Sequence, residues 1–497
     1  MNNLINRRIA PIIGIILLLS VVSGCKKFLN QAPENSITKD NFFKTKSDAE
    51  TSIISCYDAL QACTSQFLNW GEFRGDLITS NGNNNVTYPY YEYMDNTLPV
   101  SNWSVVYTLI GRVNTVIENV PDILKYDNDF TKEESNQIIA EALFLRSLAY
   151  FYLVRTFKDV PLVLQAPSND RVDFFLPKTS ADSVLDQVEK DLDTAEKYVP
   201  IQYSSNALTR GRATKGAVNA LQADVYLWRD KYTLAIDAAQ KVIDNKGLYN
   251  LVPGNDWFTI FSLKNSGESI FEVEYDASIG ETNGLIGTVG NFSASQTLTD
   301  YFKNDEGEDN VSGVRGLNKT YISGNSFWKY SGLNSSSSTN VSRSTNDPNF
   351  IVYRLSGIML LQAEALVNVS DGDSIMDRQK ALNILDTIRA RGAVDIYDYL
   401  DGHTPKGLLM NLILKERAME LATEGKRWFD LVRVGKRDNY ANADLLINNV
   451  VQSRNVGIRA QIKSRIVDPR SWYMPIYQDE LNKNPKLKQN PYYSTGN

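Results

Sequence analysis

Small and large apolar residues recur at helical spacing over long stretches of this chain. Within 133–157, Ala142, Leu145, Ala149 and Tyr152 follow the three-to-four-residue repeat of a helix with one apolar face. Such a face has to be buried against a neighbouring element. The same pattern predicts helices in three further regions: 211–247, 350–391 and 406–436.

The region 211–247 shows the pattern most clearly. Two apolar periodic stretches flank a short polar break at Arg229-Asp230-Lys231, which predicts a helix, a tight turn and a second helix. Alanines such as Ala217 and Ala239 stand where two helices have to approach closely. The arrangement resembles a tetratricopeptide unit of about 34 residues. We therefore predict an all-α-dominated fold, a tetratricopeptide-like helical-repeat scaffold with long loop-rich insertions.

The insertions differ in composition from the helical regions. They are rich in Asn, Tyr, Pro, Gly and Ser, and they fall mainly within 66–102 and 255–347. Long irregular segments inside a compact protein are usually functional or disordered. We predict the ligand-binding region there. Alternation of apolar and acidic residues over 269–275 predicts one of a few short strands.

The N-terminal residues predict export. Arg7 and Arg8 precede an apolar run over 9–22, and small residues lead to Cys25. The run is shorter than the roughly 20 residues that a membrane-spanning helix needs. The tetrapeptide ending at Cys25 resembles the bacterial lipobox, which implies cleavage of residues 1–24 and acylation of Cys25. Several acyl chains would hold residues 25–497 on a membrane.

Composition narrows the function classes. The net charge is −6 and no long basic run is present, which argues against a nucleic-acid partner. The cysteines and the single histidine, His403, show no metal-ligand spacing, and we predict neither a metal nor a cofactor. Cys56 and Cys63 stand seven residues apart in a predicted helix, too far apart along its axis for a disulfide, so we predict buried small apolar residues.

Several sequence blocks resemble one known family. The blocks, in chain order, are Phe28-Leu29-Asn30-Gln31-Ala32-Pro33, Glu416-Arg417-Ala418-Met419-Glu420-Leu421, Glu424-Gly425-Lys426-Arg427-Trp428-Phe429-Asp430-Leu431, Met474-Pro475-Ile476 and Gln489-Asn490-Pro491. Their order and spread are similar to those of the SusD/RagB outer-membrane nutrient-binding lipoproteins. The resemblance implies a helical scaffold that binds a glycan or related nutrient without catalysis. It also implies a partner, a SusC-like TonB-dependent barrel on which the lipoprotein sits as a lid at the cell surface.

Paired carboxylates leave an enzymatic alternative open, because a glycoside hydrolase needs only two at the right separation. Glu416, Glu420 and Glu424 recur every four residues on one predicted helix face. Arginines and lysines follow closely, among them Arg417 and Arg427, so we interpret the three glutamates as structural ion pairs. Trp428 and Phe429 of the most specific block are expected in the core.

Loop aromatics are the best ligand candidates. A sugar presents flat C–H faces that stack on rings, and hydroxyls that need amide or carboxylate partners. The candidate contacts are Tyr88, Tyr90, Tyr91, Tyr93, Trp70, Asp76, Asn83 and Trp328, with Trp257 as a further aromatic. The same surface could instead contact the barrel. Three hypotheses thus stay open: a nutrient-binding lipoprotein, a lipid-anchored glycoside hydrolase, and a structural lid without its own ligand site.

Overall fold

The computed structural model describes residues 42–80, 94–167, 175–306, 313–335, 339–369 and 374–494. The chain divides into two units, Met1–Lys44 and Thr45–Asn497, and every element below belongs to the second. Cys25 and the tyrosine-rich segment 88–93 lie outside the described residues.

Helices dominate the second unit, as the sequence pattern predicted. The longer ones are α4 (Lys46–Glu72), α6 (Ser104–Ile123), α7 (Lys132–Phe157), α8 (Ala181–Tyr198), α10 (Lys215–Trp228), α11 (Tyr232–Ile243), α14 (Gln296–Glu306), α15 (Leu355–Asn368), α16 (Ile375–Arg391), α17 (Lys406–Leu421), α18 (Arg427–Tyr440), α19 (Ala443–Gln452) and α20 (Arg459–Ile466). The shorter ones are α9 (Asn206–Gly211), α12 (Thr259–Ser262), α13 (Leu285–Gly290), α21 (Gln478–Lys483) and α22 (Pro491–Ser494).

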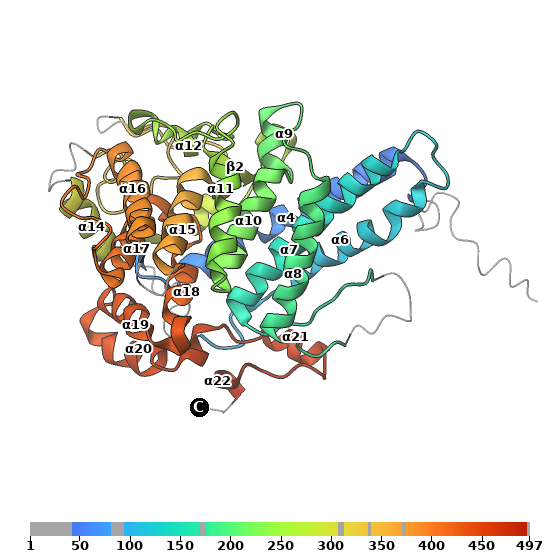
Figure 1. Cartoon of the computed structure of the whole chain (residues 1–497). Coiled ribbons are helices and arrows are strands. Elements are labelled where there is room, and N and C mark those ends of the chain that lie inside the picture. The colour runs from blue at the N-terminus through green and yellow to red at the C-terminus, as the bar shows by residue number, and fades with distance from the viewer. Residues whose placement is uncertain are drawn as a thin grey trace, which may run out of the picture. The chain divides into compact units, whose positions relative to one another are not determined.

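Consecutive helices pack side by side in a continuous row. The row runs α4, α6, α7, α8, α10, α11, α15 and α16, each helix contacting the next (Figure 1). The predicted pair is formed by α10 and α11, where Ala217, Ala220 and Ala239 are buried at the close approach. The tetratricopeptide-like scaffold is therefore confirmed.

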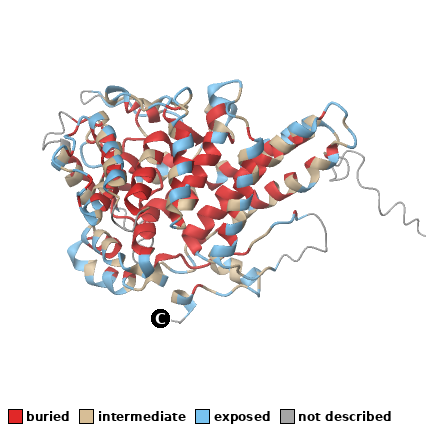
Figure 2. Ribbon diagram, in the orientation of Figure 1, coloured by how far each residue is buried: buried red, intermediate tan, exposed pale blue. Residues whose placement is uncertain are grey.

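Local sequence signals start several of these helices. The Thr45 side chain caps α4 and the Asp48 carboxylate bonds back to the Thr45 backbone, a capping box that Thr131 and Glu134 repeat at α7. Helix α7 is long and apolar enough to cross a membrane, but most of its apolar stretch is buried inside the protein (Figure 2). It is therefore a core helix of the row.

Within the described part of the chain, four short strands form two antiparallel pairs. β1 (Ile78–Ser80) pairs with β3 (Phe292–Ala294), and β2 (Ser269–Val273) pairs with β4 (Phe350–Arg354). The strand expected within 269–275 is β2. The helix expected from residue 350 onward was wrong in its first turn, because residues 350–354 are a strand that is buried on both faces. Such a strand shows no alternation, so its apolar run cannot be told from helix by periodicity.

One expected boundary needs adjustment. The insertion over 66–102 begins inside α4, since residues 66–72 form its buried last turns.

Cys56 and Cys63 lie on α4, buried and not joined by a disulfide, as predicted. Trp428 and Phe429 lie on α18 in the core, also as predicted.

Candidate functional site

Trp70, Asp76 and Trp328 are buried, although the sequence suggested them as ligand contacts. Trp70 is 0% exposed and its indole N–H donates to the Val100 carbonyl at 2.7 Å. Trp328 is 4% exposed and donates to the Asn334 carbonyl at 2.6 Å. Neither ring offers a face on which a sugar could stack, so these two expectations are corrected.

Asp76 forms a buried bidentate ion pair. Arg427 Nε and Nη2 donate to its two carboxylate oxygens at 2.6 and 2.8 Å. Burial alone would lower the pKa of Arg427, but the charge of Asp76 outweighs it and raises that pKa above its usual value. The pair joins the end of α4 to α18, and Asp76 is therefore a structural residue rather than a ligand contact.

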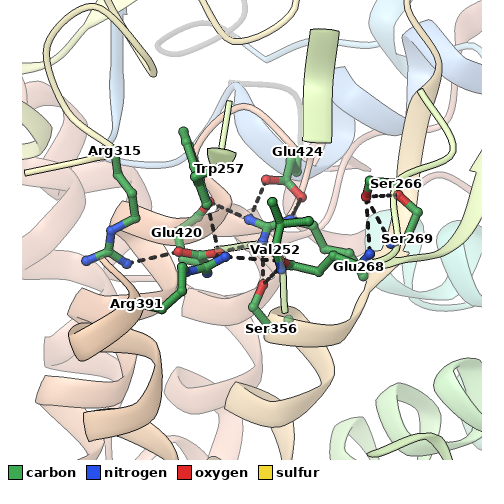
Figure 3. A network of polar contacts seen from close by, with 12 residues as sticks. Val252, Trp257, Ser266, Glu268, Ser269, Arg315, Ser356, Arg391, Glu420 and Glu424 are labelled. Atoms are coloured by element: carbon green, nitrogen blue, oxygen red, sulfur yellow. Dashed lines mark hydrogen bonds and ion pairs between the residues drawn. The ribbon is translucent and has the colours of Figure 1, made fainter. Parts of the chain in front are cut away.

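Glu416, Glu420 and Glu424 lie at the centre of a buried ion network. Glu420 accepts from Arg315 at 2.9 Å, from Arg354 at 2.5 Å and from Arg391 (Figure 3). Burial would raise the pKa of Glu420, but the three guanidinium groups outweigh it and hold that pKa well below its usual range.

The flanking glutamates are paired in the same way. Glu416 accepts from Arg315 at 2.5 Å and Glu424 accepts from Lys329 at 2.6 Å. Burial lowers the pKa of the Lys329 ammonium to about 8, with Glu424 opposing the shift. The structural interpretation of the three glutamates holds. The expected partners were wrong, because these cations come from segments far away in sequence rather than from Arg417 or Arg427.

Trp257 belongs to the same network. It is 0% exposed, and its indole N–H donates to Glu420 Oε1 at 3.3 Å (Figure 3). Lys329 Nζ lies 5.2 Å from the centre of the indole ring. This tryptophan therefore stabilises the buried charges and presents no ring face to a ligand.

The chain on either side of the tyrosine-rich segment is held by contacts that the structure describes. β1 leads into it and is held by β3, and the Ser295 hydroxyl donates to the Asp76 carbonyl at 2.7 Å. On its far side, Asn96 Nδ2 donates to Gln478 Oε1 at 2.6 Å. The ligand contacts predicted at Tyr88, Tyr90, Tyr91, Tyr93 and Asn83 lie outside the described residues and stay predictions.

A cleft of about 560 Å³ opens where α7, α10 and α18 end and α8 begins. We call it the helix-end cleft; α7, α8, α10 and α18 contribute to it, together with Tyr473. Lys158, Asp182 and Asn439 add both hydrogen-bond donors and acceptors. The backbones of Lys158 and Asn439 adopt left-handed conformations, at φ 68° and 53°. Its volume and mixed polar lining suit a polyhydroxylated ligand, and sequence reasoning did not find it.

In the described ranges, no group of three or more His, Cys, Asp or Glu side chains is arranged as metal ligands. His403 is exposed and bonded only within its own turn, 3.2 Å from Asp401.

Two family models match different parts of this chain. A family model described as starch-binding associating with outer membrane matches residues 27–227, and the SusD family model matches residues 288–493. The chain belongs to the SusD/RagB family. Among its relatives, SusD-like protein P38 of Formosa agariphila is 26% identical, covering 96% of this chain and 98% of that protein.

Solved structures share this family's fold. A SusD superfamily protein from Bacteroides thetaiotaomicron superposes with a TM-score of 0.71 at 23% identity, covering 90% of this chain and all of that one. A laminarin-binding SusD-like protein superposes with a TM-score of 0.64 at 24% identity, covering 90% of this chain and 99% of that one. At these identities the likeness establishes the fold.

Proposed function

We propose that this protein is a non-catalytic, lipid-anchored protein of the outer membrane that binds a glycan at the cell surface. We further propose that it delivers the glycan to a SusC-like TonB-dependent barrel. The observation that carries the proposal is the match of two SusD-type family models, which together span most of the chain. The lipobox-like Cys25 supplies the anchor, and a fold neighbour described as laminarin-binding supports a carbohydrate ligand.

The tyrosine-rich segment is our proposed ligand contact. Tyr88, Tyr90, Tyr91 and Tyr93 provide rings for stacking, and Asn83 provides an amide for hydroxyl groups. One buried hydrogen bond, from Ser295 to the Asp76 carbonyl, and one partly buried hydrogen bond, from Asn96 to Gln478, hold the described chain on either side of it. Binding residues often lie in segments that a rigid scaffold supports in this way.

Binding without catalysis fits the state of the carboxylates. A glycoside hydrolase needs two carboxyl groups that face the substrate at a defined separation. The three periodic glutamates are buried and held by cations, so they cannot serve as that pair.

Affinity electrophoresis against a panel of polysaccharides tests the site. The Tyr90→Ala/Tyr91→Ala double variant is expected to lose the retardation shown by the unmodified protein. Tyr126→Ala/Tyr399→Ala is the matched control, because both tyrosines are exposed and belong to other parts of the sequence. Loss in an Asp182→Asn/Tyr473→Phe variant instead would assign binding to the helix-end cleft. Released reducing ends after incubation would favour the hydrolase.

The anchor and the partner need a separate experiment. Affinity purification from detergent-solubilised outer membranes is expected to recover a TonB-dependent barrel together with this protein. A Cys25→Ser variant is expected to lose acyl labelling and membrane association. A protein that is labelled and retained in the membrane but recovers no barrel would refute the delivery step while leaving the anchor intact.

A further inference from the structure

Three arginines meet at one small pocket near the C-terminal helices. Arg74 follows α4, Arg454 follows α19, and Arg465 lies on α20. The remaining described lining is apolar, aromatic or hydroxylic, and it includes no carboxylate. The cavity is about 50 Å³, room for a few water molecules or one small oxyanion. We call it the arginine pocket.

Arg74 is the most deeply placed of the three. It is 6% exposed, and its Nη atoms donate only to the backbone carbonyls of Ser471 and Trp472. Its Nε has no hydrogen-bond partner among the described residues. The guanidinium stacks over the Trp428 ring, with Cζ 4.2 Å from the ring centre. The indole N–H of Trp428 also has no partner among the described residues. Carbonyls solvate a guanidinium but do not neutralise it, and an uncompensated buried charge is costly.

Other buried arginines in the core show the usual solution. Arg433 is held by Glu364 and Asp430 at 2.8 and 2.7 Å, and those carboxylates outweigh burial and raise its pKa. For Arg74, burial dominates and lowers the pKa to about 10, opposed only by two tyrosines. Within the described residues, no carboxylate side chain therefore neutralises the buried Arg74 guanidinium.

The other two arginines add positive charge at the same place. Arg454 is 8% exposed and donates to the Gly75 carbonyl at 3.0 Å, directly beside Arg74. Arg465 is half-buried on the pocket wall. Three guanidinium groups around one cavity repel one another, and an anion between them would be attracted by all three.

We propose that the arginine pocket binds a small oxyanion, either the carboxylate or sulfate group of an acidic glycan or a free inorganic anion. Guanidinium groups form bidentate, charge-assisted hydrogen bonds with such groups, and the Trp428 N–H is a further donor. The acidic glycan as source rests on the function proposed above, whereas anion binding does not. The pocket would then select ligands that carry a negative charge.

Sulfate titration of the whole protein tests the pocket. Thermal unfolding is followed as sodium sulfate replaces sodium chloride at constant ionic strength, and a saturable rise in Tm is expected. Arg465→Gln is the informative variant, because Arg74 holds two carbonyls whose loss could impair folding. It is expected to weaken the apparent sulfate affinity at least about tenfold. Lys463→Gln removes a positive charge from an exposed position of the same helix outside the pocket and is expected to leave the affinity unchanged.

Competition distinguishes the two sources. A uronate oligosaccharide that displaces sulfate, while its neutral counterpart does not, identifies an acidic glycan; displacement by neither leaves a site for free anions. No saturable response in the unmodified protein, or an equal response in Arg465→Gln, would overturn the pocket. A persistent sulfate response in a protein that binds no neutral or acidic glycan would refute the proposed function and leave the pocket standing.

Discussion

Gly71 lies where the most specific sequence block presses against α4. A Cβ built on Gly71 would stand 1.8 Å from the carbonyl oxygen of Gly425, a backbone atom that no rotamer change can move. Gly425 itself has φ 68°, so it is held in a left-handed turn that favours glycine. We predict that Gly71→Ala forces α4 and the turn at Gly425 apart.

The magnitude follows from two opposing effects. Ordinary van der Waals contact begins near 3.4 Å, so the two backbones would have to separate by about 1.6 Å. Such overpacking is expected to cost an amount of unfolding free energy at or above the upper end of about 1–3 kcal/mol. Alanine improves helix propensity by up to about 1 kcal/mol. The expected net loss is about 2 kcal/mol or more in the free energy of unfolding.

Chemical denaturation measures this loss, with Gly407→Ala as the control. Gly407 lies in the first turn of α17 with nothing within 4 Å of its Cβ position, so alanine there is expected to be neutral or slightly stabilising. Equal stability of the two variants would refute the close approach between α4 and Gly425.

Three further predictions concern buried charges. Glu420→Gln leaves three guanidinium groups without their shared carboxylate and is expected to cost about 3–5 kcal/mol of unfolding free energy, measured by denaturant titration. Asp76→Asn should destabilise by a similar amount, yet leave glycan affinity of the folded protein unchanged in a direct titration. Burial raises the pKa of Glu72 from 4.5 to about 7. The folded protein then binds more protons than the unfolded chain in this window, so stability falls as pH rises from 4.5 to 7. Glu72→Gln should reduce that slope in denaturation curves across pH, and an unchanged slope would assign it to other groups.

The helices were predictable because each buries one face. On α4, the buried residues Ile53, Cys56, Leu60, Cys63 and Phe67 follow alternating spacings of three and four. Trp70 continues the same series, which was the available sign that it lies in the core. Trp70 also stands shortly before an Asn- and Tyr-rich stretch of the sequence, and that composition misleadingly suggested a ligand contact.

The ion network was predictable only in part. The four-residue spacing of Glu416, Glu420 and Glu424 indicated a shared helix face. Their partners Arg315 and Arg354 come from other segments, and no local pattern specifies which distant cation meets a buried carboxylate. Pairing of this kind depends on tertiary packing, as does the arginine pocket.

We propose above all that the protein binds a glycan through its tyrosine-rich segment without cleaving it. Calorimetric titration with the polysaccharide that retards the protein most strongly tests it directly. We predict saturable binding, no newly formed reducing ends in the same sample, and loss of binding in Tyr90→Ala/Tyr91→Ala but not in Tyr126→Ala/Tyr399→Ala. Equal affinity in the two double variants, or turnover of the ligand, would contradict it.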